Sequence, residues 1–220
     1  MSYFQSLKPD QVFCINLKTR PDRLALIKQE LQKVGLSTVR FHQPDKDPRG
    51  GKQGVYLSHQ HIATTALSEG LSYVCIFEDD VKFLPHRLTA TSQRAMESFL
   101  MECSEWDVLY LGHNPLNVQP TTRKGIIRCH SLATHAYILS QAGMKKLVGK
   151  EYNGTAIDVL YQQEFKCYAL EKDIAHQPPD QRSDVDEHSL LFTPDTRYLR
   201  EGVSNMSLWV QRLMGRVEVC

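Results

Sequence analysis

The stretch YVCIFEDDVKFLP, from Tyr73 to Pro85, decides how this chain is interpreted. Its apolar run from Tyr73 to Phe77 is typical of a core strand, and three carboxylates follow at once: Glu78, Asp79 and Asp80. Neighbouring carboxylates repel one another, and each makes ionisation of the next more costly. Their concentration at a strand end therefore indicates that a positive group lies there.

Strands and helices alternate on both sides of this stretch. Apolar runs typical of strands lie at 11–17, 38–42 and 106–111, and they alternate with helical patterns at 21–35, 56–67 and 85–103. This order predicts a mostly parallel sheet covered by helices. The carboxyl ends of parallel strands lie along one edge, where such sheets bind ligands, so we expect the acidic triplet at a binding edge.

The second half of the chain is less regular. We expect strands at 133–139 and 167–170 and helices at 140–148 and 155–165, with Ser140 as an N-cap. The tail at 207–217 carries apolar and basic residues together. It either covers the core or makes a peripheral contact with a membrane surface.

Composition bounds the class of protein. The chain has 220 residues, 41% hydrophobic and 23% charged, with a formal net charge of +1, which predicts one domain and no nucleic-acid partner. No apolar run is long enough to span a bilayer, and the N-terminus lacks a basic-then-apolar leader, so we expect a cytoplasmic protein. The six cysteines are scattered, which favours buried free thiols over disulfides.

The acidic triplet has two interpretations. Glu78 and Asp80, one residue apart, can direct both carboxylates to one cation with Asp79 alongside, and hard oxygen ligands suit Mg²⁺ or Mn²⁺. Alternatively, the acids open the helix that follows, where its dipole stabilises them by up to about 1 kcal/mol. No GxGxxG or Walker loop is present, which disfavours a Rossmann dehydrogenase and a P-loop nucleotidase.

Several segments in order resemble glycosyltransferase family 25, which includes bacterial lipooligosaccharide galactosyltransferases and collagen galactosyltransferases. They are FCINLKTRPDRL (13–24), GVYLSHQHIATTALSEGLSYVCIFEDDVKF (54–83), WDVLYLG (106–112), HAYILSQAGMKKLV (135–148), AIDVLY (156–161), and the final His176 with Ser183-Asp184. The resemblance covers roughly residues 11 to 186. The segment 112–130 has no counterpart in it.

The resemblance implies an α/β, GT-A-like fold in a single domain over residues 1–220. A Rossmann-like nucleotide-sugar-binding half would span about 11–112, a smaller acceptor half about 113–186, and a tail 187–220. It further implies an inverting transferase that moves a hexose, typically galactose from UDP-galactose, to a glycan or glycoconjugate hydroxyl, with Mn²⁺ or Mg²⁺ as cofactor. Lipopolysaccharide assembly is one setting for such chemistry.

The resemblance also implies roles for particular residues. Asp80 is the first choice for a metal ligand, with Glu78 and His176 as further ligands. The residues expected to hold the nucleotide are Asn16, Leu17, Arg20, Arg23, Ser58, His59, Glu78 and Asp79. A surface ion pair remains the alternative for Arg23, and helix capping for Ser58.

An inverting transferase also needs a general base for the acceptor hydroxyl. Asp158 is the candidate, with Asp184 in reserve, although Asp158 equally suits the first turn of a helix. Two other functions stay open. One is a metal-dependent nucleotide-sugar hydrolase or nucleotidyltransferase, and the other is a non-catalytic carbohydrate-binding relative.

Overall fold

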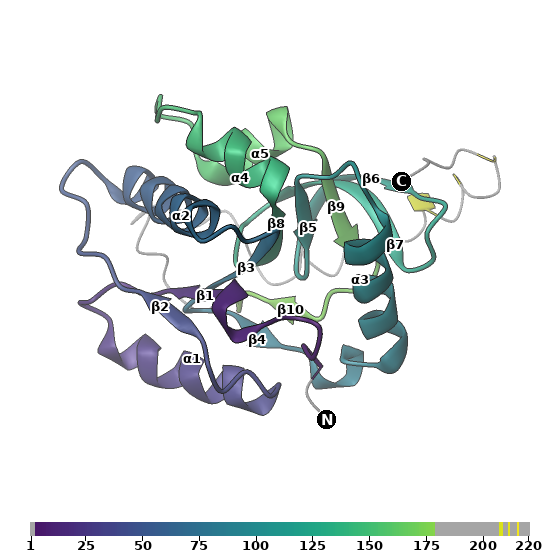
Figure 1. The fold of residues 1–220 in the computed structure, drawn as a ribbon, viewed down its shortest axis with the longest axis horizontal. Coiled ribbons are helices and arrows are strands. Elements are labelled where there is room, and N and C mark those ends of the chain that lie inside the picture. Colours follow the sequence, from purple (N-terminus) through teal and green to yellow (C-terminus); the bar gives the residue numbers. More distant parts are fainter. Residues whose placement is uncertain (1–2, 179–206, 209–210, 212–214, 216–220) are drawn as a thin grey trace.

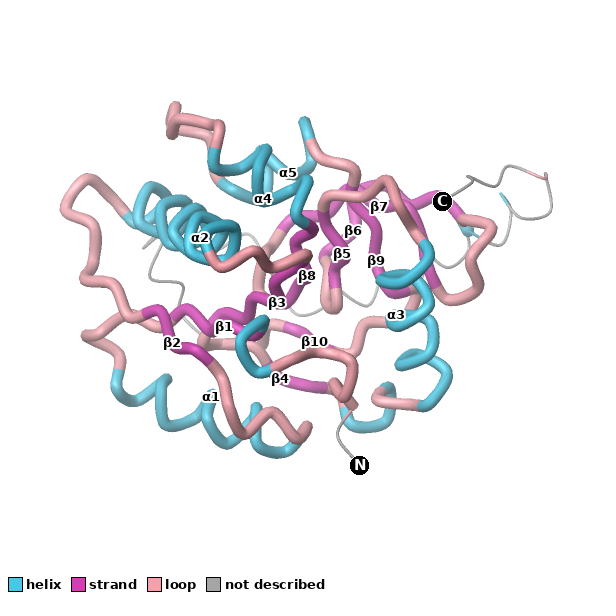
Figure 2. Tube along the Cα trace, in the orientation of Figure 1, coloured by secondary structure: helices cyan, strands magenta, loops and turns pink. Residues whose placement is uncertain are grey.

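The computed structural model describes residues 3–178, 207, 208, 211 and 215. Within them an eight-stranded sheet has the order β2-β1-β3-β8-β5-β9-β7-β6. The strands are β1 Val12–Ile15, β2 Arg40–His42, β3 Tyr73–Glu78, β5 Val108–Tyr110, β6 Asn114–Pro120, β7 Ile126–Leu132, β8 Ala136–Ser140 and β9 Cys167–Leu170. Figure 2 shows these strands in magenta between helices in cyan.

Most strands of the sheet run in one direction. β1 pairs in parallel with β2 and β3, and β5 pairs in parallel with β9. β8 lies antiparallel between β3 and β5, while β7 is antiparallel to both β9 and β6. Only β8 and β7 therefore oppose the other strands of this described sheet, and the predicted mostly parallel α/β sheet is confirmed.

Helices cover both faces of the sheet (Figure 1). They are α1 Pro21–Lys33, α2 Gly51–Ser68, α3 Ala90–Glu102, α4 Gln141–Val148 and α5 Ile157–Glu164, with short 3-10 turns at Pro9–Gln11 and Pro85–Arg87. α1 and α3 pack against one face, and α2, α4 and α5 pack against the other. Along β3, Cys75 and Phe77 face the first layer while Val74 and Ile76 face the second, as the two-residue period of a strand requires.

Several element boundaries differ from the prediction. α2 begins at Gly51 rather than at residue 56, where the predicted helix begins. The predicted helix at 85–103 is instead a 3-10 turn at Pro85–Arg87 followed by α3. The Thr89 hydroxyl accepts a hydrogen bond from the Ser92 amide and so caps the start of α3. Ser140 caps α4 through the Gly143 amide, as predicted.

The segment at 112–130, which had no assigned structure, contains β6 and most of β7. These strands form an antiparallel hairpin at the edge of the sheet. The Gln211 amide donates to the Val118 carbonyl of β6, and Leu208 is buried in the core layer of α2, α4 and α5. These described tail residues therefore cover the core, which was one of the two interpretations. No described helix is both long and apolar enough to cross a membrane.

The cysteines follow the prediction only in part. Cys14, Cys75, Cys129 and Cys167 are buried free thiols. Cys103 is disulfide-bonded, so the expectation of free thiols is wrong at that position.

Candidate functional site

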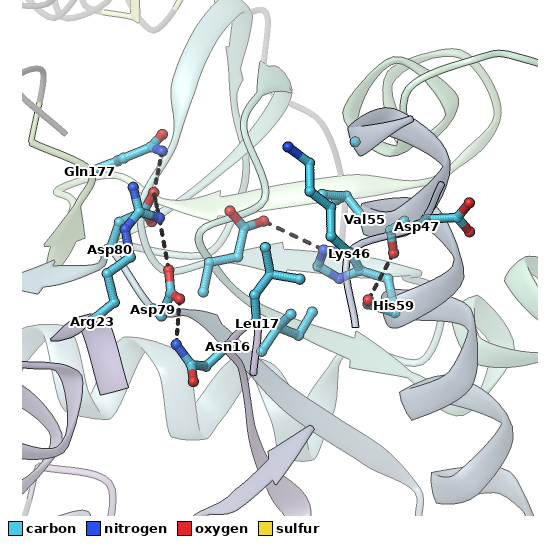
Figure 3. A pocket seen from close by; sticks show the side chains of 15 residues that line it. Asn16, Leu17, Arg23, Lys46, Asp47, Val55, His59, Asp79, Asp80 and Gln177 are labelled. Carbon is cyan, nitrogen blue, oxygen red and sulfur yellow. Dashed lines mark hydrogen bonds and ion pairs between the residues drawn. The ribbon is translucent and has the colours of Figure 1, made fainter. Parts of the chain in front are cut away.

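A pocket lies where β1 and β3 end, at the predicted binding edge. It encloses about 700 Å³, including space open to solvent. The first turns of α2 form one wall, and the acidic triplet forms the other. The lining residues are Ile15, Asn16, Leu17, Arg23, Lys46, Asp47, Gly51, Gly54, Val55, Ser58, His59, Glu78, Asp79, Asp80 and Gln177. Figure 3 shows how their side chains lie around the pocket.

Glu78, the last residue of β3, points toward α2 and the loop before β8. Its Oε1 accepts a hydrogen bond of 2.7 Å from the Thr134 hydroxyl and lies 3.4 Å from Nε2 of the fully buried His59. Burial acts to raise the pKa of Glu78, but the contact with His59 and the hydrogen bond from Thr134 outweigh it and lower the pKa. Glu78 is thus held in its charged form.

Asp79 points the opposite way, toward α1 and β1. Its carboxylate accepts hydrogen bonds from Asn16 at 2.7 Å and from the Arg23 guanidinium at 2.9 Å. Both side chains of the Arg23–Asp79 pair are buried, being 8% and 10% exposed, so the alternative of a surface ion pair is wrong for Arg23. Burial nevertheless raises the pKa of Asp79, because desolvation exceeds the stabilisation that these donors supply.

Asp80 has an unsatisfied oxygen. Its Oδ2 accepts a hydrogen bond of 2.7 Å from the Gln177 amide and lies 3.7 Å from the Arg23 guanidinium. Its Oδ1 is buried and has no hydrogen-bond partner among the described residues. Burial, followed by the charge of Glu78, raises the pKa of Asp80 to about 7. A buried carboxylate oxygen without a donor is costly, and a bound cation would remove that cost.

The three carboxylates do not converge on a single point. Across residues 3–178 and the described tail positions, no three histidine, cysteine or acidic side chains form a group that could hold a metal. Their mutual repulsion is offset instead by separate partners within the chain. The arrangement fits an ion that takes one oxygen from Asp80 and the rest from a phosphate-bearing ligand and water, as Mg²⁺ commonly does.

A short strap of chain brings Gln177 to Asp80. Two-residue strands β4 (Lys82–Phe83) and β10 (Ala175–His176) pair in antiparallel fashion, and the Ile174 amide donates to the Leu111 carbonyl. His176 pairs with Lys82 in this ladder and does not line the pocket, whereas its neighbour Gln177 does. The metal-ligand role of His176 stays a prediction.

Gly112 lets this strap pass close to β5. A Cβ atom at Gly112 would lie 2.2 Å from the Ala175 carbonyl oxygen and 2.4 Å from Nε2 of His135. Gly112→Ala is expected to cost roughly 1–3 kcal/mol of unfolding free energy, because backbone must move. Urea denaturation measures this. Gly149→Ala is the matched control, since its Cβ meets nothing closer than 3.4 Å. Equal stability of the two variants would contradict the packing described.

The other predicted residues divide into two sets. Asn16, Leu17, Ser58 and His59 line the pocket, whereas Arg20 pairs with Asp22 outside it. Ser58 lies within α2, where its hydroxyl donates to the Gly54 carbonyl, so the capping interpretation is wrong.

The two candidate bases are placed differently. Asp158 lies in the first turn of α5, where its Oδ2 accepts from the Ala133 amide at 3.2 Å and its Oδ1 from the Val159 amide. It does not line the pocket. Asp184 lies outside the described residues. The role of each as a base stays a prediction.

Sequence analysis missed seven pocket residues. They are Ile15, Lys46, Asp47, Gly51, Gly54, Val55 and Gln177. A signal existed for Lys46 and Asp47, because they follow β2, the parallel neighbour of β1, and so reach the same sheet edge. No comparable local signal marks Gln177, which reaches Asp80 across 97 residues of sequence.

Comparisons with known proteins agree with this picture. Residues 49–161 match the family model described as Glycosyltransferase family 25 (LPS biosynthesis protein). The human protein named "Inactive glycosyltransferase 25 family member 3" is 30% identical over 173 residues, covering 64% of this chain and 29% of its own length. "Procollagen galactosyltransferase 1-A" of Xenopus laevis is 28% identical over 178 residues, covering 64% and 28%. The chain thus spans less than a third of these relatives.

The solved structure of A197 from STIV superposes with a TM-score of 0.50 at 13% identity. It covers 83% of this chain and 97% of its own. At that identity the likeness concerns the fold alone. Together with the family match, it confirms the predicted GT-A-like α/β fold.

Proposed function

Because this chain belongs to glycosyltransferase family 25, we propose that it transfers a hexose from a UDP-sugar to a hydroxyl of a glycan or glycoconjugate, with inversion. Galactose is the first sugar to test, since relatives include proteins named procollagen galactosyltransferases. The observation that carries the proposal is the unsatisfied Oδ1 of buried Asp80 in a pocket at the carboxyl edge of the sheet.

The pocket residues suit a nucleotide diphosphate. A divalent ion held at Asp80 Oδ1 would neutralise negative charge on the departing UDP. Lys46 lies across the pocket from Asp80 (Figure 3) and makes no hydrogen bond or ion pair with any other described residue. Its ammonium group is therefore available for a phosphate oxygen. Asn16 and Arg23 fix the position of Asp79, so this part of the wall is preorganised.

Inversion requires a base that takes the proton from the acceptor hydroxyl as that oxygen attacks the sugar. We retain Asp158 as the proposed base and Asp184 as the reserve. Asp158 belongs to the acceptor half, and the Ala133 amide that it binds adjoins Thr134, the donor to Glu78. This short connection links the proposed base to the donor pocket.

Relatives also favour a second candidate function, in which the pocket binds a nucleotide sugar without turnover. Four of them carry the word inactive in their names. UDP release from a panel of UDP-sugars with Mn²⁺ decides between the two. We expect UDP and a glycoside when an acceptor is present. Free sugar together with UDP, without a glycoside, would indicate a hydrolase, and ligand binding without any product the non-catalytic relative. A nucleotidyltransferase would instead release pyrophosphate when it is given UTP and a sugar 1-phosphate.

A further inference from the structure

A chain of buried polar groups connects the pocket to α5. Nε2 of His59 lies 3.4 Å from Oε1 of Glu78, and its Nδ1 lies 2.7 Å from the Tyr137 hydroxyl. The Tyr137 hydroxyl lies 3.1 Å from that of Tyr161 on α5. His59 and both tyrosines are 0% exposed. Four groups from α2, β3, β8 and α5 therefore form one continuous line that solvent does not reach beyond Glu78.

Only one arrangement of protons gives both tyrosine hydroxyls an acceptor, while Nε2 of His59 makes no hydrogen bond to another described residue. Among the described residues, the Tyr161 hydroxyl has the Tyr137 hydroxyl as its one polar partner, so Tyr161 must donate to Tyr137. Tyr137 then donates to Nδ1 of His59, which leaves the ring proton on Nε2, facing Glu78. The opposite direction would leave the Tyr161 proton without an acceptor. With a neutral ring, it would also turn the Nε2 lone pair of His59 toward the charged Glu78.

Both phenols are protonated, as either direction of donation requires. Burial raises the pKa of both Tyr137 and Tyr161 above that of a free phenol, so the choice of direction rests on the hydrogen-bond partners. The 3.4 Å separation of His59 and Glu78 exceeds that of a good hydrogen bond, and contacts of this kind shorten when a ligand completes a site.

α5 reaches Glu78 by a second route. Asp158, in the first turn of α5, accepts a hydrogen bond from the Ala133 amide. Thr134, the residue after Ala133, donates a hydrogen bond to Oε1 of Glu78, the same oxygen that faces His59. Ala133 has φ of 80°, the one positive φ of a non-glycine residue in the described chain. This left-handed conformation is disfavoured for alanine and persists only where its surroundings fix it. Both contacts, from Thr134 and from His59, are made to Oε1 of Glu78, so its Oε2 is left for a ligand.

We propose that His59 is a positioning residue, locked as its Nε2–H tautomer by the two tyrosines so that it aims Glu78 into the pocket. Its effect on a ligand rests on the proposed function and adds to it that Glu78 accepts a hydrogen bond from a hydroxyl of the nucleotide sugar. The tautomer itself does not depend on that function. Direct contact of His59 with the nucleotide, which the sequence suggested, is replaced by contact through Glu78.

The first test is nuclear magnetic resonance of the ¹⁵N-histidine-labelled protein without ligand, with His59→Gln used to assign the resonances. We expect the proton of His59 on Nε2 and an acceptor Nδ1, whose shift changes in Tyr137→Phe. Tyr110→Phe is the matched control, because it removes another fully buried hydroxyl that is not part of the chain. A proton on Nδ1, or a Tyr137→Phe spectrum equal to that of the control, would overturn the proposal.

The second test is the affinity for UDP with Mn²⁺, measured by calorimetry. Tyr137→Phe is expected to weaken binding by roughly 2- to 10-fold, the effect of one lost hydrogen bond, while Tyr110→Phe does not. His59→Gln, which keeps an N–H donor, should retain more affinity than His59→Leu. Unchanged affinity in Tyr137→Phe would contradict the positioning role. Absence of binding by the wild type would instead contradict the proposed function, and the tautomer measurement would still decide on the buried chain.

Discussion

Replacing Asp80 by asparagine is expected to abolish donor turnover and, at the same time, to stabilise the unliganded protein. The asparagine keeps the size of the side chain but removes the charge that a cation needs. Loss of one group that stabilises developing charge commonly costs about 100- to 1,000-fold in rate. UDP release from a UDP-sugar with Mn²⁺ measures this loss.

The stability effect of Asp80→Asn depends on pH in a defined direction. Burial raises the pKa of this carboxyl from 3.8 to about 7, so the folded protein holds the proton more tightly than the unfolded chain does. The contribution of Asp80 to stability is therefore present at low pH and falls as pH rises from about 4 to about 7. Above pH 7 the variant should exceed the wild type by up to roughly 4 kcal/mol.

Asp45→Asn serves as the control for both measurements. Asp45 makes an exposed ion pair with Lys18 and does not line the pocket, so turnover and stability should stay near wild type. If Asp80→Asn lowered stability at pH 8, the Asp80 carboxylate would stabilise the unliganded fold. It would then not be true that its charge destabilises the fold until a ligand binds. Retained turnover in that variant would remove Asp80 from the mechanism.

Removing Arg23 is expected to have the second large effect, this time on folding. Arg23 is the cation beside Asp79 and Asp80, and Arg23→Met would leave two buried carboxylates without it. Breaking a buried ion pair by deleting one partner typically costs about 3–5 kcal/mol. Urea denaturation at pH 8 measures the loss, because both carboxyls are then most strongly charged.

A double-mutant cycle identifies the cause of that loss. Adding Asp79→Asn to Arg23→Met removes one of the uncompensated charges and should restore part of the stability. Arg20→Met is the control, because Arg20 and Asp22 form a more exposed pair, and it should change stability by less than about 1 kcal/mol. A double variant no more stable than Arg23→Met would show that lost packing of the arginine stem, not charge, dominates.

Local patterns in the sequence predicted much of the fold. They also predicted which edge of the sheet holds the pocket. β9 matches its predicted range of 167–170, and β3 begins with the apolar run predicted at 73–77 and ends one residue beyond it. Because parallel strands end along one edge, the positions of Asn16 and Asp80 near one pocket followed from strand order alone. Short apolar runs that are bounded by polar residues therefore predict well where strands begin and end.

The partners of the carboxylates could not be predicted in the same way. Asp79 meets Arg23 across 56 residues and Asn16 across 63, distances over which periodicity says nothing about pairing. The hairpin of β6 and β7 was missed because its outer strand is mostly polar and contains two prolines, which do not resemble a core strand. Capping at Thr89 was missed because Ser92, not an acidic residue, completes the box.

The most direct test of the central claim, that this pocket binds the diphosphate of a nucleotide sugar through an ion at Asp80, is calorimetric titration of UDP. Wild-type protein and Asp80→Asn are each titrated with Mn²⁺ and with EDTA. We expect binding by the wild type with Mn²⁺, weakened by about 10- to 100-fold in EDTA, and equally weak binding by Asp80→Asn in both conditions. No binding by the wild type, or affinity that is the same in all four titrations, would contradict the claim.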